Sequence, residues 1–380
     1  MPSSSSRVVF ALVGDVRGSS RALRQLRALA DLGVEVDVLT FGPPAQPGEV
    51  AEGVRLHVLG EPSGQGPLFF RRCHRLFREA ALAFQSAAYH ASDLYVLPAL
   101  AAAAKRHGAR LVLDARELYP HVDATAGKPW ATQVWSALER RYLPRTDAVL
   151  TVNDSIADRM AETYGIARPV VTHNVPERQT VERTDTLRDL LGIPAERKIV
   201  LYQGLVRAGR GLRTLVDALR DVPEAHLVVI GDGPNKHAVV GRASSHLPGR
   251  AHFLPHTPPG DLLHLTASAD LGVHIPRPIT LSIYLALPNK LFEYLMAGLP
   301  VVVADIPEMK RVVEGHEVGL TVDPRDRDAV AEAIRRALAD AGARQRWRAN
   351  IPGVFEAYRP ETSRDRFQQV YRDLLGLASV

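Results

Sequence analysis

Short apolar runs alternate with longer amphipathic segments along most of the chain. In the first half the runs are RVVFALVG (7–14), VEVDVLT (34–40), VRLHVL (54–59), DLYVLP (93–98), RLVLD (110–114) and DAVLTVN (147–153). In the second half they are KIVLYQG (198–204), HLVVIGDG (226–233), ADLGVHI (269–275), PVVVAD (300–305) and VGLTVD (318–323). Strands that alternate with helices predict parallel sheets that are covered by helices on both faces.

This rhythm breaks in the stretch THNVPERQTVERTDTLRDLLGIP, where Pro, Thr and charged residues replace the apolar periodicity. The chain of 380 residues is long enough for two domains, each with its own core. We therefore predict an α/β protein of two doubly wound, Rossmann-like domains that face a cleft. Their predicted bounds are 1–176 and 190–352, with a linker at 177–189 and a C-terminal helix, after the breakers Pro352 and Gly353, that crosses back at 360–380.

The composition narrows the class of protein. Apolar residues make up 46% and charged residues 23%, as in ordinary globular proteins, and the net charge of +5 is too diffuse to indicate nucleic-acid binding. Cys73 is the only cysteine, so neither a disulfide framework nor a thiolate metal cluster is expected. No apolar run is long enough to span a membrane and no signal peptide is apparent, which makes the cytoplasm the expected compartment.

A glycine-rich turn follows the first strand of the second half. In YQGLVRAGRGLRTLVDAL the residues Gly204, Gly209 and Gly211 allow close approach of a ligand to the backbone, and Arg207 and Arg210 offer guanidinium groups suited to phosphate. The alternative is an ordinary strand–helix turn with solvated arginines. The G-x-G of VVIGDGPN is a weaker signal, often only a tight turn.

The stretch LPNKLFEYLMAGLPVVVAD (287–305) predicts a helix and then a buried strand. Pro288 suits a first helical position and Gly298 a C-terminal cap. Lys290 breaks a local rule, because the dipole disfavours a cation in the first helical turn. It shares a helix face with Glu293, and the pair is either a simple ion pair or part of a site for a diphosphate and a ribose diol.

Three further features are weighed against simpler interpretations. Asp326 and Asp328 are expected to start a surface helix, and His252 and His256 are expected to be isolated loop histidines, so no metal site is predicted. The segment 69–84, FFRRCHRLFREAALAF, predicts a basic amphipathic helix. A solvated domain helix is the favoured interpretation, and the alternative is peripheral contact with the inner membrane surface and a lipid-linked acceptor.

GLVRAGRGLRTL, VVIGDGP, ASADLGVHI and PNKLFEYLMAGLPVV, in this order and spacing, resemble the nucleotide-sugar domain of family-4 glycosyltransferases, which are retaining enzymes of the GT-B fold. VGDVRGSSRALRQLRALADLGVEVDVLT and VLDARELYP resemble the acceptor-side domain of the same family. The resemblance covers nearly the whole chain. It implies a nucleoside-diphosphate sugar as donor, and no metal or other cofactor.

The resemblance also implies roles for particular residues. Glu293 would bind the ribose hydroxyls, Arg210 and Lys290 would hold the diphosphate, and Arg207 would substitute for a family arginine where this chain has Leu205. The family's first glutamate of Glu-x7-Glu falls at Leu285 and is absent. The remaining donor-side positions are Gly14, Arg17, Gly204, Ser282 and Asn289, with Arg21 and Asn174 as weaker candidates.

Arg116 takes the place of the histidine in the family's "DxHE" segment. An arginine is not a base at neutral pH, but it can anchor a hydroxyl or a phosphate, so we assign Arg116 to the catalytic group and place Glu117 and His121 at the acceptor. The simpler interpretation is a structural Arg116–Glu117 pair at a strand end.

The function that we expect is transfer of a sugar from a nucleoside-diphosphate sugar to a glycan, lipid-linked or small-molecule acceptor, with retention and without metal. The alternatives are a sugar-nucleotide epimerase or phosphorylase of the same fold, and a nucleotide-sugar-binding protein without turnover. A dinucleotide oxidoreductase fits less well, because the first strand leads to GDVRGSS and not to G-x-G-x-x-G.

Overall fold

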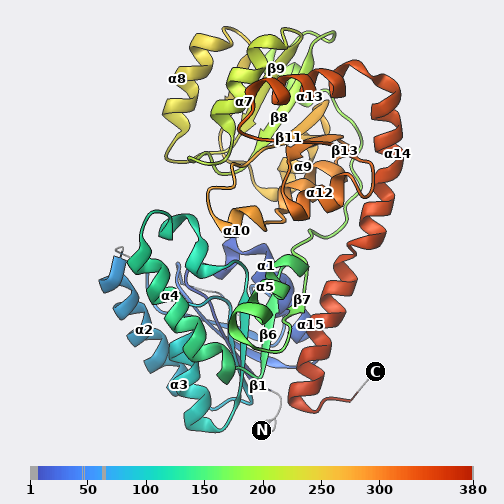
Figure 1. Cartoon of the computed structure of the whole chain (residues 1–380). Coiled ribbons are helices and arrows are strands. Elements are labelled where there is room, and N and C mark those ends of the chain that lie inside the picture. The colour runs from blue at the N-terminus through green and yellow to red at the C-terminus, as the bar shows by residue number, and fades with distance from the viewer. Residues whose placement is uncertain (1–6, 45, 47, 62–65, 379–380) are drawn as a thin grey trace. The chain divides into compact units, whose positions relative to one another are not determined.

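The computed structural model of the chain describes residues 7–44, 46, 48–61 and 66–378. It divides the chain into two compact units (Figure 1). The first consists of Met1–Asn174 together with Pro360–Val380, and the second of Val175–Arg359. The expected α/β class is confirmed, as is the return of the C-terminal helix to the first unit.

The first unit is built around a seven-stranded parallel sheet of order β3-β2-β1-β4-β5-β6-β7. Its strands are β1 (Arg7–Ala11), β2 (Glu35–Thr40), β3 (Val54–Val58), β4 (Ala88–Ala91), β5 (Arg110–Ala115), β6 (Ala148–Thr151) and β7 (Val170–Val171). Its α-helices are α1 (Ser20–Ala30), α2 (Gly66–Leu82), α3 (Leu97–His107), α4 (Pro129–Tyr142), α5 (Asp154–Tyr164) and α15 (Pro360–Leu375).

The second unit has a six-stranded parallel sheet of order β10-β9-β8-β11-β12-β13. Its strands are β8 (Lys198–Gln203), β9 (Ala225–Ile230), β10 (Ala251–Leu254), β11 (Leu271–His274), β12 (Val301–Ala304) and β13 (Gly319–Val322). Its α-helices are α6 (Thr186–Leu191), α7 (Leu212–Ala218), α8 (Lys236–His246), α9 (Pro259–Ala267), α10 (Leu281–Tyr284), α11 (Asn289–Met296), α12 (Pro307–Val313), α13 (Arg327–Ala339) and α14 (Ala341–Ala357).

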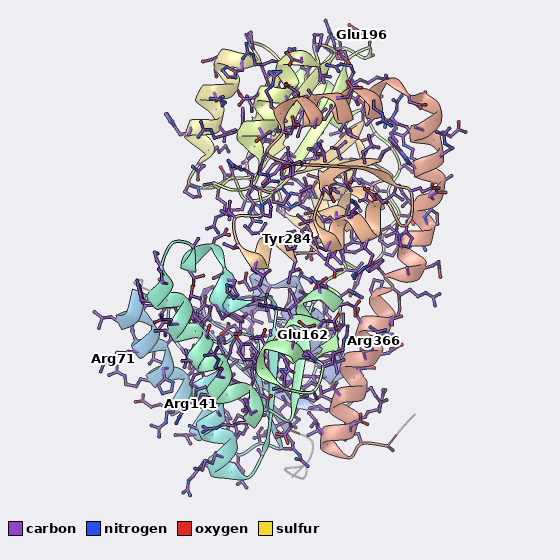
Figure 2. The ribbon with its side chains drawn as sticks, in the orientation of Figure 1. Arg71, Arg141, Glu162, Glu196, Tyr284 and Arg366 are labelled. Carbon is purple, nitrogen blue, oxygen red and sulfur yellow. The ribbon has the colours of Figure 1, made fainter. Side chains whose placement is uncertain are left out.

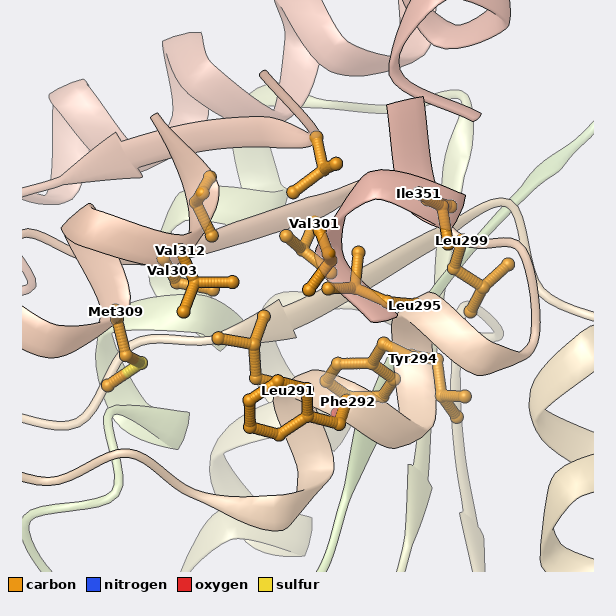
Figure 3. Packing of buried hydrophobic residues seen from close by; sticks show 14 of the residues in the cluster. Leu291, Phe292, Tyr294, Leu295, Leu299, Val301, Val303, Met309, Val312 and Ile351 are labelled. Carbon is orange, nitrogen blue, oxygen red and sulfur yellow. The ribbon is translucent and has the colours of Figure 1, made fainter. Parts of the chain in front are cut away.

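Helix α11 forms because its apolar residues fall on one face. Leu291, Phe292 and Leu295 are buried and pack in a cluster with Val301 and Val303 of β12 (Figure 3). Burial of large apolar side chains of this kind stabilises a fold by about 1.5–3 kcal/mol each. The helix is thereby pinned to the sheet, and its N-terminus is fixed at the sheet's carboxyl edge.

Several sequence-based boundaries need correction. DLYVLP is not a strand: β4 precedes it at Ala88–Ala91, and Asp93 instead accepts hydrogen bonds from the backbone N–H groups of Val13 and Val96, which ends the strand and starts α3. Strands β7 and β10 were not predicted. Pro352, predicted with Gly353 to break the chain, lies inside α14.

Two other predictions near helix and strand ends were also wrong. Pro288 is the N-cap of α11, so the first helical residue is Asn289. His252 is not in a loop but on β10, where its ring stacks on that of His226, with 3.1 Å between Nε2 of His252 and Nδ1 of His226.

The segment predicted as the linker lies in the second unit, and there Arg183 pairs with Asp270 at 2.7 Å.

Helix α15 completes the core of the first unit although it comes from the far end of the chain. Phe367 and Tyr371 are buried in the same cluster as Phe10 of β1, and the Tyr371 hydroxyl lies 2.7 Å from Nδ1 of His90 on β4. Gln368 donates a hydrogen bond to the carbonyl of Ala28. Helix α15 therefore contributes stability to the first unit.

Phe367→Ala should lower the free energy of unfolding by about 3–5 kcal/mol, because it removes a buried aromatic ring from this core. Urea unfolding followed by circular dichroism measures the change. The exposed neighbour Arg364→Ala is the control and should change stability by less than about 0.5 kcal/mol. A small loss for both variants would show that α15 adds little to the first core.

Candidate functional site

The two units each have a topological switch point, where neighbouring strands feed helices on opposite faces. In the second unit it lies between β8 and β11, and ligands of doubly wound sheets bind beyond the carboxyl ends of such strands. The turn after β8 and the residues around the start of α11 converge here, because Lys290 of α11 reaches Gly204 and Tyr202. The switch point is therefore where the candidate site is built.

Glycine is required in the turn after β8 by close backbone packing. A Cβ at Gly211, which has a φ of +80°, would lie 2.0 Å from the carbonyl oxygen of Ile275 at the end of β11. A Cβ at Gly204, with a φ of +115°, would lie 2.4 Å from Nζ of Lys290. Both positions combine a left-handed backbone with a filled space, so the turn is held against β11 and beneath the lysine.

The G-x-G after β9 has a structural role. A Cβ at Gly231 would lie 2.1 Å from the carbonyl oxygen of Gly204, and one at Gly233 would lie 2.3 Å from that of Val206. The Val206 N–H donates to the carbonyl of Asp232 at 2.8 Å. These glycines let the β9 turn support the β8 turn, in agreement with the simpler interpretation of this motif.

Glu293 is held by a chain of hydrogen bonds that starts in the strand. Gln203 Nε2 donates to Oε2 of Glu293 at 2.5 Å, and the Thr266 hydroxyl donates to Oε1 of Gln203 at 2.8 Å. The Gln203 N–H donates to the Tyr294 hydroxyl at 2.9 Å. Burial raises the pKa of Glu293, while Gln203 and then Lys290 favour its ionised form. One carboxylate oxygen is thus fixed in place.

Lys290 does not form the ion pair with Glu293 that its spacing suggested. Among the described residues it makes neither an ion pair nor a hydrogen bond, and its Nζ lies 5.3 Å from the centre of the Tyr202 ring. Burial, and then the charge of Arg210, lower its pKa to about 8, against the opposite effect of Glu293. A lysine whose surroundings lower its pKa toward neutral pH is suited to bind an anionic ligand.

His274 adds a third basic group at the end of β11. The residue is 1% exposed and its Nδ1 has no hydrogen-bond partner among the described residues. Burial, and then the charges of Lys290 and Arg210, lower its pKa well below the ordinary value, so the imidazole is neutral at physiological pH. The electrostatic field around the turn after β8 is therefore positive. The charges that produce it are those of Lys290 and Arg210, and His274 does not contribute.

The other donor-side predictions fall on the same edge of the second unit. Arg207 and Arg210 lie partly buried in the turn after β8. Ser282 is buried on α10, and Asn289 opens α11. The N-cap Pro288 offers no side-chain cap, so the N-terminus of α11 retains its partial positive charge.

In the first unit, Gly14 and Arg17 lie in the loop after β1, as predicted. Gly14 has a φ of +124°, and its carbonyl accepts from the Thr40 hydroxyl at 2.7 Å. The Arg17 guanidinium is already engaged: Nε binds Asp15 at 2.7 Å and Nη1 binds Glu49 at 3.3 Å. To contact a phosphate, Arg17 would have to exchange these carboxylates.

Arg21 is not a phosphate ligand, which corrects its place among the weaker candidates. It is 5% exposed and makes a bidentate pair with Asp114 at 2.6 and 2.7 Å. Its remaining donors bind the carbonyl and the hydroxyl of Thr172, both at 2.7 Å. These four hydrogen bonds engage the guanidinium and hold β5 to the chain just before Asn174.

The acceptor-side predictions follow β5. Arg116 is partly buried directly after the strand, Glu117 is exposed, and His121 is partly buried in a 3₁₀ turn at Tyr119–His121. Burial, and then the charge of Arg159, lower the pKa of His121. Arg116 lies within the electrostatic influence of the buried carboxylates Asp93 and Asp114.

Both halves of the chain match models of glycosyltransferase families. Residues 18–176 match the "Glycosyl transferase 4-like domain" and residues 183–353 match "Glycosyl transferases group 1". Together the two matches span most of the chain, and its two doubly wound parallel sheets are those of the GT-B fold.

Known glycosyltransferases resemble this chain over much of its length. A glycosyl transferase of Escherichia coli (strain K12), provisionally assigned to colanic acid biosynthesis, is 27% identical over 267 residues, and the alpha-D-kanosaminyltransferase of Streptomyces kanamyceticus is 24% identical over 255. The matches cover 64% and 62% of this chain, and 64% and 63% of those proteins, just under two thirds. The sucrose-phosphate synthase of Thermosynechococcus elongatus shares the fold, with a TM-score of 0.77 at 19% identity over 98% of this chain and 100% of that one.

The described part of the chain has no group of three His, Cys, Asp or Glu side chains placed to hold a metal ion. Asp326 is the N-cap of α13 and accepts from the N–H groups of Asp328 and Ala329, which confirms the helix start predicted for this D-x-D. In the described residues no helix is long and apolar enough to cross a membrane.

Sequence reasoning missed the residues that support Glu293 and Lys290. Gln203, Thr266 and Tyr294 position the carboxylate, and Tyr202 and His274 lie beside the lysine. The one available signal was the polar Gln203 at the end of an otherwise apolar strand. Thr266 and Tyr294 carry no such signal, because their roles depend on contacts between segments far apart in sequence.

Gly211→Ala should destabilise the second unit by about 2 kcal/mol or more, because the new Cβ collides with the Ile275 carbonyl in a left-handed backbone. Gly241→Ala is the matched control: nothing lies within 4 Å of its Cβ, and in helix α8 alanine should be neutral or add up to about 1 kcal/mol. Urea unfolding of both variants measures the change in the free energy of unfolding. Equal stability would refute the packing argument.

Proposed function

We propose that this protein is a family-4, retaining glycosyltransferase that moves a hexosyl or N-acetylhexosaminyl group from a nucleoside-diphosphate sugar to a sugar, lipid-linked or small-molecule acceptor. The observation that carries the proposal is the pair of cationic side chains at the switch point of the second sheet, Lys290 without a carboxylate partner among the described residues and Arg210 beside it. A bound diphosphate supplies the negative charge that no carboxylate of the described residues supplies to Lys290 in an ion pair.

Arg210 and Lys290 hold the diphosphate and, with the N-terminus of α11, stabilise the negative charge that develops on the leaving group as the glycosidic bond breaks. Such groups accelerate the reaction only if they are held in place before it begins. Here Lys290 is fixed above Gly204 and Tyr202. The same charges take over the role that a metal ion has in other transferases, so no metal is required.

Glu293 binds the ribose of the donor. Its Oε2 is taken by Gln203, while Oε1 has no partner among the described residues and can accept from a ribose hydroxyl. Gly204, Arg207, Ser282 and Asn289 complete the donor side.

In the first unit, Gly14 and Arg17 approach the donor phosphates, and Arg116, Glu117 and His121 face the acceptor. Arg116 is assigned to anchoring a hydroxyl or phosphate and not to proton transfer, since a guanidinium stays charged. Leu285, where the family has a glutamate, leaves the transferred sugar with one polar contact fewer.

Calorimetric titration of the purified protein with UDP, GDP, ADP, dTDP and NAD, in the presence of EDTA, tests the donor. Tight binding of one nucleoside diphosphate would support a metal-free donor site and identify the base. Incubation of the matching nucleotide sugars with and without acceptors then separates transfer from epimerisation, which releases product without an acceptor. If none of these nucleotides bound, the result would contradict the donor assignment.

Glu293→Ala should weaken binding of the preferred nucleoside diphosphate at least tenfold, or about 1.4 kcal/mol, without unfolding the chain, because the ribose loses its acceptor. Isothermal calorimetry gives the affinity and circular dichroism checks the fold. Exposed Glu196→Ala is the control. Unchanged affinity in a folded Glu293→Ala variant would remove Glu293 from the site.

The affinity for the nucleoside diphosphate should fall as the pH rises above about 8. The free protein loses the Lys290 proton near this pH, whereas a bound diphosphate favours the protonated amine, so binding takes up a proton between about pH 8 and 10. Calorimetry in buffers of different ionisation enthalpy measures this uptake. Lys290→Met should abolish it and Lys310→Met, on the exposed face of α12, should not. Equal uptake by the Lys290 variant would assign the proton elsewhere.

A further inference from the structure

A groove of about 710 Å³ lies in the first unit between helices α2, α3 and α4 and includes residues of the basic segment 69–84. Its volume is in the range of small-molecule binding sites. Its lining includes the aromatic residues Phe70, Tyr95 and Trp135 and the basic residues Arg71, Arg72 and Arg75. The groove thus combines an apolar interior with basic side chains from one helix.

Three aromatic rings form the interior. Phe70 of α2 stacks on Tyr95, with centroids 5.0 Å apart, and meets the edge of Trp135 of α4 at 5.2 Å. Tyr95 and Trp135 contact each other edge to face at 4.9 Å. Offset and edge-to-face pairs of this kind hold rings in fixed orientations. The groove is therefore preformed and apolar.

The basic side chains come from α2. Arg71, Arg72 and Arg75 are exposed, and the helix has no acidic residue before Glu79. Figure 2 shows Arg71 on α2 and Arg141 on α4 at the surface of this unit. Burial, and then the charge of Arg78, lower the pKa of His74, so the arginines carry the positive charge. A ligand that covers this surface is anionic.

Large apolar side chains are exposed on the same helices. Leu68 at the start of α2 is 77% exposed, and Trp130 and Val134 of α4 are 59% and 50% exposed. Trp130, Val134 and Leu138 follow one another at i, i+4 and i+8, so they form a stripe on one face of α4 that leads to the groove. Exposed tryptophan next to arginine is typical of surfaces that contact the interface of a lipid bilayer.

We propose that this surface, formed by the groove with Leu68, Trp130 and Val134, docks on a membrane leaflet rich in anionic lipid. Arg71, Arg72 and Arg75 bind the lipid phosphates. The exposed apolar side chains enter the boundary between headgroups and chains, and the aromatic groove receives an acyl or prenyl chain. The charge pattern favours a lipid surface over a neutral protein partner, because it pairs several cations with an apolar stripe. The inference does not depend on the proposed function.

Co-sedimentation with vesicles of phosphatidylglycerol and phosphatidylcholine tests the docking surface. Partitioning onto mixed vesicles should exceed that onto pure phosphatidylcholine at least tenfold and decrease with salt. The variant Arg71→Gln/Arg72→Gln/Arg75→Gln should lose about 100-fold of the partitioning, since each cation contributes about 1 kcal/mol. The matched control Arg27→Gln/Lys105→Gln/Arg106→Gln removes the same charge from exposed positions of α1 and α3 and should retain it.

Tryptophan fluorescence provides a second readout. Two of the three tryptophans, Trp130 and Trp135, lie on this surface, and Trp347→Phe removes the third, which packs in the second unit. In that background the emission should shift to the blue on addition of anionic vesicles, and Trp130→Ala should reduce the shift at least by half. Circular dichroism checks the fold of every variant.

Three outcomes would overturn the proposal. The first is absence of binding to anionic vesicles by the folded parent protein. The second is equal loss in both triple variants, which would indicate attraction by net charge alone. The third is binding of a single-stranded oligonucleotide in place of vesicles through the same three arginines. Since nucleotide binding by the second unit is measured separately, failure here leaves the donor site untouched, and the reverse also holds.

Discussion

The close packing of backbone against backbone at the carboxyl edge of the second sheet is the constraint on which the rest of this unit depends. At Gly211, Gly231 and Gly233 the space that a Cβ would occupy is filled by a carbonyl oxygen of a neighbouring segment. The turns after β8 and β9 are therefore locked to each other and to the end of β11. This rigid surface fixes the backbone around Lys290, and the hydrogen bonds from Thr266 through Gln203 fix the carboxylate of Glu293.

The electrostatic character of the site follows from what surrounds the lysine. Burial and Arg210 lower the pKa of Lys290, and the carboxylate three residues later is turned toward Gln203. Lys290 and Arg210 thus lie close enough to repel each other, and no nearby carboxylate among the described residues is paired with Lys290. Natural sequences keep such an unfavourable arrangement mainly where a ligand completes the site. The neutral His274 lies in the same field and adds no charge of its own.

The first unit uses the same architecture in a different way. Arg21 at the start of α1 binds Asp114 and Thr172, so its role is to hold the chain together. Exposed basic and apolar side chains lie instead on the helices α2 and α4, where arginines flank an aromatic groove. Two similar sheets therefore carry different chemistry, because it resides in turns and surface helices and not in the strands.

The sequence by itself determined the fold class, most strands and helices, and the stretch of the second unit on which the candidate donor residues lie. Apolar periodicity and glycine-rich turns are local signals, and they placed β8, β11, β12 and α11 correctly. Only the tertiary structure decided that Lys290 and Glu293 are not an ion pair, that α14 runs through Pro352, and that Asp93 ends β4. It also brought Thr266 to Gln203, 63 residues apart. These outcomes depend on contacts between distant segments, where packing and hydrogen-bond satisfaction override the preference of any short stretch.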